Sequence, residues 1–231
     1  MLPARAFFMK NLKKVAKMSR LAFLNALRLH SDSIFLYKKK SYPSSFLLAV
    51  LAQEELGKTF LLEDHVYRTR TSEKTDELDL EYGKLFLEGL KSHKIKQGRF
   101  SREADDVWKY RGNRYPREVR EISSGALDER KQNATYVGLT KDGKKINLKG
   151  RVINPVTKIK SKDCESYITR LNDYIIELSE GCRRGIYTVD TEELDSELTL
   201  NLVSELESLW AKKSKDSVNK LNKIRKFSIE K

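Results

Sequence analysis

Cysteine, proline and long apolar runs are all scarce in this chain of 231 residues. Four prolines and eleven glycines are too few for a turn-rich all-β fold or a long disordered linker. The longest apolar run, 46–52, is far shorter than the roughly 18 to 20 residues that a membrane-spanning helix needs. These shortages predict a mainly helical protein that does not cross a membrane.

The two cysteines, Cys164 and Cys182, are the only thiols. If 158–184 forms one helix, they lie about 27 Å apart, too far for a disulfide. Both are expected to be small buried side chains in a reducing compartment. No secretory signal follows Met1, and Met9 opens a basic amphipathic stretch that is an alternative start. We therefore expect a cytoplasmic protein.

The charge is strongly positive and unevenly distributed. Lys and Arg number 46 against 33 Asp and Glu, a net charge of +13. Residues 1–40 hold ten basic side chains and one acidic, and residues 91–117 hold nine and three. In contrast, residues 187–210 hold seven acidic side chains and no basic one. Such basic patches suit a phosphate backbone or an acidic partner, although a solvated lysine-rich surface gives the same count.

Apolar residues recur at three- and four-residue steps over 10–39, which predicts a first helix. The segment 41–45 contains a proline and ends that helix, and a second helix is expected over 43–69. Because the connection is short, the two helices should form an antiparallel hairpin. A third helix is expected over 76–96, and the pattern becomes irregular after Gly98.

A β-hairpin is expected near the middle of the chain. Residues 134–139 and 144–149 are rich in strand-forming side chains and flank the turn pair Asp142-Gly143. Helix resumes near residue 158 with a new apolar stripe. The hairpin is thus an insertion of about residues 134–149 in a helical domain.

The helices and the hairpin expected so far all lie before about residue 185. Residues 186–231 would add an acidic helix, at about 191–210, and a basic C-terminal tail.

Polar residues interrupt the apolar face of the second helix. Glu54, Lys58 and His65 fall among leucines at 100° per residue. An unpaired buried charge is costly, so Glu54 and Lys58 should pair with each other or with groups on a facing helix. Gly57 costs about 1 kcal/mol relative to alanine in a helix, which indicates a close helix or ligand approach. The pair is either an ion pair that fixes helix register or a polar floor for a phosphate or partner.

His93 occupies a similar position on the third helix. It lies on an apolar face and is surrounded by cations of the same segment, namely Lys91, Lys94, Lys96 and Arg99. One interpretation is a histidine that only completes the core. The other is a phosphate site in which His93 moves a proton.

Three blocks resemble the signatures of AbiV-type abortive-infection proteins, in the same order. They are Ser45–Lys58, which contains Glu-Glu-Leu-Gly-Lys, then Ser92–Lys96, and then Arg130–Val137. That family belongs to the HEPN superfamily of helical bundles, and the resemblance extends over about residues 10–185. It implies a HEPN-like antiparallel bundle that commonly forms homodimers, and a role in bacterial defence against phage by shutting down the infected cell or phage protein synthesis.

The sequence departs from the family's usual nuclease pattern. Many HEPN proteins are metal-independent ribonucleases that use an Arg followed, after a short gap, by a His. This chain has only His30, His65 and His93, and Arg28 is too close to His30. Any cleavage would need a non-standard catalytic set, for which the candidates are His93, Lys96 and Glu54.

We therefore expect a defence protein that binds a phage protein or an RNA or ribosome-associated partner. A ribonuclease with a non-standard site is the first alternative, and a structural or antitoxin-like helical partner is the second. No cofactor motif or metal-ligand spacing is found. The residues expected to form the binding network are Glu54, Glu55, Lys58, His65, His93, Lys94 and Lys96.

Overall fold

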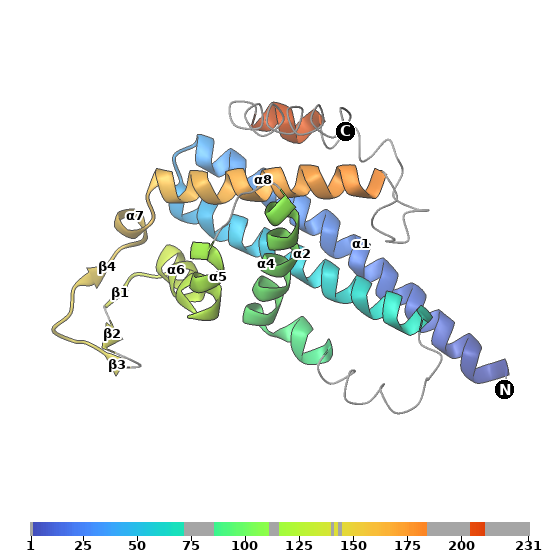
Figure 1. Ribbon diagram of the computed structural model, residues 1–231. Coiled ribbons are helices and arrows are strands. Elements are labelled where there is room, and N and C mark those ends of the chain that lie inside the picture. Colours follow the sequence, from blue (N-terminus) through green and yellow to red (C-terminus); the bar gives the residue numbers. More distant parts are fainter. Residues whose placement is uncertain are drawn as a thin grey trace.

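The computed structural model describes residues 2–71, 86–110, 116–139, 141–142, 145–183 and 204–210. Helices dominate these ranges (Figure 1), which confirms the expected mainly helical fold. Shorter helical stretches cover residues 86–91 and 204–209. The labelled helices are α1 (Leu2–Lys38), α2 (Tyr42–Thr71), α4 (His93–Tyr110), α5 (Pro116–Ser123), α6 (Ala126–Thr135), α7 (Pro155–Lys158) and α8 (Ser161–Arg183).

The first two helices form the expected antiparallel hairpin (Figure 1). Lys40 adopts a left-handed conformation with φ of 63°, and the amide of Ser41 donates to the carbonyl of Leu36 at 2.9 Å. This is a common way to satisfy the last carbonyls of a helix. The tight turn lets α2 fold back along α1.

Helix α2 lies at the centre of the bundle and packs against α1, α4, α6 and α8. Its side chains are consequently buried on several sides, among them Phe46, Leu56 and Leu62, each 0% exposed. We expected one apolar face on this helix, but the buried part of its surface is wider than that face. A helix surrounded by neighbours shows little amphipathic contrast.

One buried polar contact ties α1 to α8. His30 is fully buried and lies 2.9 Å from the Oδ1 of Asn172 through its Nε2. Burial lowers the pKa of His30 to about 4, so its imidazole is neutral at physiological pH. We interpret His30 as part of the helix packing rather than as a surface site.

A second polar contact joins α1 to α2. Ser19 donates to the Oε1 of Glu63 at 2.9 Å. Burial raises the pKa of Glu63 to about 7, and the hydrogen bond from Ser19 offsets only part of this effect. The folded protein therefore holds a proton on Glu63 that the unfolded chain releases near pH 4.5.

We expect the stability of the protein to fall as the pH rises from about 4.5 through about 7. Unfolding releases this proton in that window, so Glu63 destabilises the fold by about 1–3 kcal/mol above it. Glu63→Gln keeps an oxygen that can accept from Ser19 and should remove this decline. Urea titrations of both proteins at several pH values measure the difference, and parallel pH profiles would contradict the assignment.

The third predicted helix differs from the structure. Residues 86–91 are helical, but Ser92 interrupts the helix and α4 begins at His93. The hydroxyl of Ser92 accepts from the amide of Ile95 at 3.3 Å, as an N-cap residue does. Helix α4 then continues through Gly98, where irregular structure was expected. The part of the expected helix over 76–85 lies outside the described residues.

The β-hairpin is present with a changed pairing. Strands β2 (Lys141–Asp142) and β3 (Lys145–Ile146) pair, so Asp142, expected in the turn, instead ends β2. Gly143 lies outside the described residues. The flanking strand β1 (Gly138–Leu139), however, pairs with β4 (Val152–Ile153), beyond the range expected for the second strand. Residues 134 and 135 belong to α6, because the helix continues to Thr135.

The remaining expectations are only partly covered by the structure. Within the described ranges, no helix is long and apolar enough to cross a membrane. Cys164 is a buried free thiol, while the side chain of Cys182 lies outside the described residues. Of the predicted acidic helix, residues 204–209 are helical and Leu206 is buried. The rest of that helix and the basic tail lie outside the described part.

Candidate functional site

The carboxylate of Glu54 is the centre of a buried polar cluster. Glu54 is only 2% exposed, and its two oxygens contact three nitrogen atoms. Oε2 lies 2.6 Å from the Nδ1 of His93. Oε1 accepts from the Nε2 of Gln97 and from the Nζ of Lys131, both at 2.8 Å. An ionised carboxylate only accepts hydrogen bonds, so the Nδ1 of His93 carries the hydrogen here.

A second carboxylate completes this cluster, which we call the Glu54 cluster: Glu54, His93, Gln97, Asp128 and Lys131. The Oδ1 of Asp128 accepts from Gln97 at 3.1 Å and lies 3.5 Å from the Nζ of Lys131. Lys131 is thus held between two carboxylates, and its side chain is 15% exposed. Each charge inside the cluster has an opposite partner, which buried charges require.

Local structure explains how the cluster residues meet. The Ser92 cap places His93 in the first turn of α4, and Gln97 follows one turn later on the same face. Asp128 and Lys131 are three residues apart on α6, so they too share a face. Helices α4 and α6 both pack on α2, which carries Glu54.

Gly57 permits the close contact between α2 and α4. A Cβ built at Gly57 would overlap the backbone carbonyl of Lys96 and lie 3.2 Å from its Cα. The obstacle is backbone, which cannot rotate away as a side chain can. The glycine predicted to mark a close approach is therefore at a helix–helix contact one turn from Glu54.

Of the two alternatives expected for Glu54, the structure has the second, because its partners lie on facing helices and Lys58 is not among them. The Nζ of Lys58 instead lies 3.5 Å from the Oε2 of Glu55 on the same helix. The side chains of Lys58 and Glu55 are 28% and 21% exposed. They form a partly solvated pair of modest strength, because Glu54 turns toward α4 and α6 and finds its partners there.

The other predicted site residues are scattered around the cluster. Lys96 is buried at 8% exposure, and its backbone contacts Gly57 rather than Glu54. Lys94 is exposed on the first turn of α4. His65 stacks on Phe86, with ring centroids 4.3 Å apart, and lies about 16 Å along α2 from Glu54. Within the predicted network, two pairs are directly joined, Glu54 with His93 and Glu55 with Lys58.

Sequence reasoning missed Gln97, Asp128 and Lys131. The spacing of His93 and Gln97, four residues apart, was available as a signal for one helix face. Lys131 lies inside the third block that carried the family resemblance. Arg130, its neighbour, binds Glu121 at 2.9 Å and Asp163 at 3.4 Å. The three blocks therefore meet at one carboxylate, through Glu54, His93 and Lys131.

His93 is the most exposed member of the cluster. The side chain of His93 is 55% exposed, although its Nδ1 is bound to a buried carboxylate. A carboxylate that orients an imidazole in this way is typical of histidines that transfer protons. The side chain of Asp128 is 36% exposed, whereas Glu54, Gln97 and Lys131 are buried or nearly so. Among the described residues, no group of three His, Cys, Asp or Glu side chains is arranged to hold a metal ion.

Comparison with protein families gives one finding. The family model HEPN_AbiV, described as AbiV, matches residues 14–176. The matched range includes α2, α4 and α6 and hence the whole Glu54 cluster. Comparison with curated proteins and with solved structures finds no match.

Proposed function

This chain belongs to the AbiV family of the HEPN superfamily, and from that premise we propose that it restricts phage growth by binding a partner rather than by cleaving RNA. The family suggests the abortive-infection role. The binding mechanism is supported by the state of the Glu54 cluster. Lys131 is neutralised by both Glu54 and Asp128, so it is not a free cation.

Cleavage of RNA by its own 2′-hydroxyl needs a base and a cation at the phosphorane. His93 meets the first need, but Lys131 is already bound between two carboxylates. Moving Lys131 to a phosphate would leave Glu54 buried with fewer donors, which is costly. This saturation of the cluster is the observation that favours binding over catalysis.

The partner we propose is a phage protein, and the alternative is RNA or a ribosome-associated component. The surplus of basic residues supports both, because Lys and Arg attract carboxylates as well as phosphates. Both partners fit a protein that acts inside the infected cell, and we propose a cytoplasmic location.

We expect a host that expresses the chain to show reduced phage plating, while the purified protein leaves RNA intact in EDTA. The comparison needs the wild type, His93→Ala and an empty vector. If His93 acts only by holding the surface of the Glu54 cluster in place, His93→Ala weakens phage restriction. The RNA then stays as intact with this variant as with the wild type. Rapid RNA cleavage in EDTA that His93→Ala abolishes would contradict the proposal.

A ribonuclease with a non-standard site remains the second candidate function. It is favoured by the half-exposed imidazole of His93, which a buried carboxylate holds by Nδ1. In that case, Glu54→Gln would lower the cleavage rate without changing RNA binding. Incubation of RNA in EDTA with the wild type and with Glu54→Gln therefore separates the two candidates.

We also propose a homodimer. Helix α1 exposes three large apolar side chains at spacings that place them along one side, namely Met18, Leu21 and Phe35. Light scattering should give about twice the chain mass of 26.8 kDa at micromolar concentration. The variant Leu21→Asp should give a monomer. Leu87 is another exposed leucine, and Leu87→Asp should leave the dimer intact. A wild-type mass of one chain would rule the dimer out.

A further inference from the structure

One end of the molecule combines strong positive charge with exposed apolar side chains. The short strands and α7 lie beyond α6 at the left of Figure 1, away from the long helices. Between residues 136 and 162 the sequence holds eight basic side chains and one acidic. This end lies outside the Glu54 cluster and takes no part in it.

The pairing of β1 with β4 determines which side chains point outward. Leu139 is opposite Val152, and Gly138 is opposite Ile153. Paired residues share a face of a β-ribbon, and residues two apart along a strand do so as well. Ile153 is buried at 8% exposure, whereas Val152 is 68% exposed. The face with Val152 is therefore the outer one.

This outer face, which we call the ribbon face, consists of Val137, Leu139 and Val152. Val137 is 71% exposed and lies two residues before Leu139. Further exposed apolar side chains lie close to the ribbon face in the sequence, namely Tyr136, Leu148 and Val156. Single exposed apolar residues are ordinary, but several on one small ribbon indicate an interaction surface.

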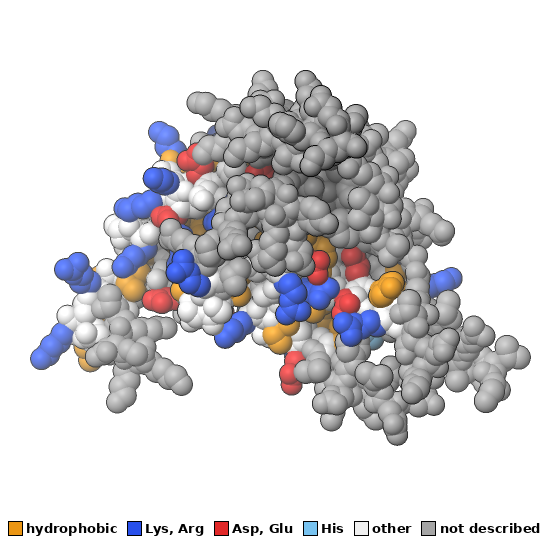
Figure 2. Space-filling view, viewed as in Figure 1, with side chains coloured by type: hydrophobic (Ala, Val, Ile, Leu, Met, Phe, Trp, Pro, Cys, Tyr) orange, Lys and Arg blue, Asp and Glu red, His pale blue; other side chains and the backbone are white. Residues whose placement is uncertain are grey.

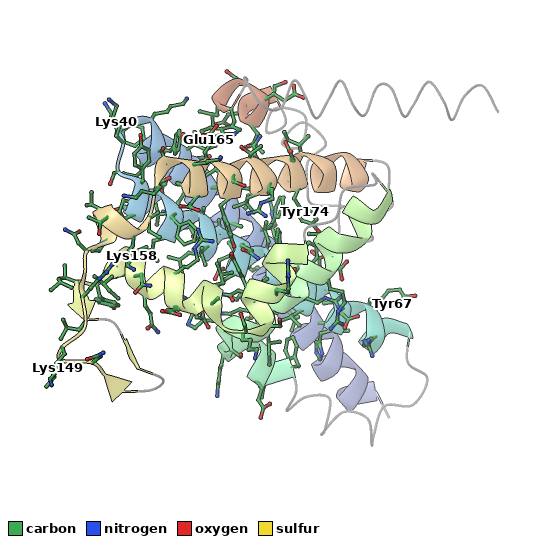
Figure 3. The ribbon with its side chains drawn as sticks, turned by 60° about the vertical axis from the view of Figure 1, so that its left-hand side comes forward. Lys40, Tyr67, Lys149, Lys158, Glu165 and Tyr174 are labelled. Carbon is green, nitrogen blue, oxygen red and sulfur yellow. The ribbon has the colours of Figure 1, made fainter. Side chains whose placement is uncertain are left out.

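Exposed cations lie close to the ribbon face in the sequence. Lys149, Arg151, Lys158 and Lys160 are all exposed. Figure 3 shows Lys149 and Lys158 along the same side of the molecule, with Lys40 of the α1–α2 turn above them. Lys and Arg side chains also gather at this left-hand side in Figure 2. The nearest acidic side chain in the following helix, Asp163, is bound by Arg130.

We infer that the ribbon face and these cations form a docking surface for an acidic protein with an apolar centre. Protein interfaces combine an apolar middle with a polar rim, and the cationic rim here selects a partner of negative charge. Single-stranded RNA fits less well, because it is bound by aromatic stacking and favours Arg. The exposed apolar residues here are mostly aliphatic, and most of the exposed cations are lysines.

This inference deepens the proposed function, since it names the surface and the chemistry of the protein partner. The test uses a defined probe, so it does not depend on phage restriction. The probe is a fluorescent peptide with a Val-Leu-Val-Leu centre between two runs of four glutamates. Matched probes replace the apolar centre by serines or the glutamates by lysines, and a uridine oligonucleotide of equal length represents RNA.

We expect fluorescence anisotropy to show binding of the acidic apolar peptide that weakens as salt rises. The serine peptide should bind about tenfold more weakly, and the lysine peptide should not bind. Val152→Asp should weaken binding of the acidic apolar peptide about tenfold, and a Lys158→Glu/Lys160→Glu variant should do the same. The control Leu87→Asp places the same change at an exposed leucine elsewhere and should leave binding unchanged. Circular dichroism checks that each variant is folded.

Several results would overturn the inference. They are tighter binding of the uridine oligonucleotide than of the peptide, equal binding of the serine peptide, or equal effects of Val152→Asp and Leu87→Asp. Phage plating of a host with Val152→Asp separates this inference from the proposed function. If the wild type restricts phage and Val152→Asp restricts equally well, the docking surface is wrong and the defence role stands. If the peptide binds as expected but the wild type does not restrict phage, only the proposed function fails.

Discussion

Gly57→Ala is expected to destabilise the protein by about 3 kcal/mol, because the added methyl group would overlap the backbone of α4. The built Cβ collides with the carbonyl of Lys96, and relief requires α4 to move away from α2. Alanine favours a helix over glycine by about 1 kcal/mol, which offsets only part of this loss. Urea denaturation of the purified variant measures the change in the free energy of unfolding.

Gly98 provides the matched control. It lies within α4, and a Cβ built there meets nothing within 4 Å. Gly98→Ala should therefore be neutral or stabilise the protein by up to about 1 kcal/mol. If both alanine variants have the same stability, the close approach of α2 and α4 at Gly57 is not present in solution.

Glu54→Gln is expected to cost about 3 kcal/mol, since it breaks a buried ion pair and disturbs a saturated set of donors. The amide keeps the shape of the side chain but loses its charge, and its NH₂ group must face a donor. Lys131 would then keep only Asp128 as a charged partner, at 3.5 Å. Chemical denaturation at neutral pH measures this loss.

Glu55→Gln is the matched control on the same helix. Glu55 contacts only the partly exposed Lys58 in the described network, so the expected change is within about 0.5 kcal/mol. Lys58→Ala should be equally mild for the same reason. A double variant, Glu54→Gln with Lys131→Met, should lose less than the sum of its single changes, because the two residues interact. Additive losses would show that the buried pair does not form.

Local sequence signals predicted the first two helices and the short connection between them. The break over 41–45 was correct because turns and helix ends depend on neighbouring residues. Strands β2 and β3 form near the predicted turn, but Asp142 belongs to β2, and Gly143 lies outside the described residues. The predicted end of the third helix, at residue 96, was wrong, because the apolar pattern continued past Ser92. The hydroxyl of Ser92 caps the N-terminus of a new helix, α4. This local hydrogen bond determined the helix boundary, although the apolar periodicity continued across it.

The sequence by itself determined the helical class and the family resemblance, and it pointed to Glu54, Gly57 and His93 as residues of helix contacts. A charged residue on an apolar helix face must find a partner, and a glycine inside a helix indicates a close contact. Only the tertiary structure decided which partner Glu54 takes, because the choice depends on which helices meet. Lys131 is 77 residues away in sequence and Lys58 is only four, yet α2 turns Glu54 toward α6. Helix packing brings those two charges together, and no local spacing specifies it.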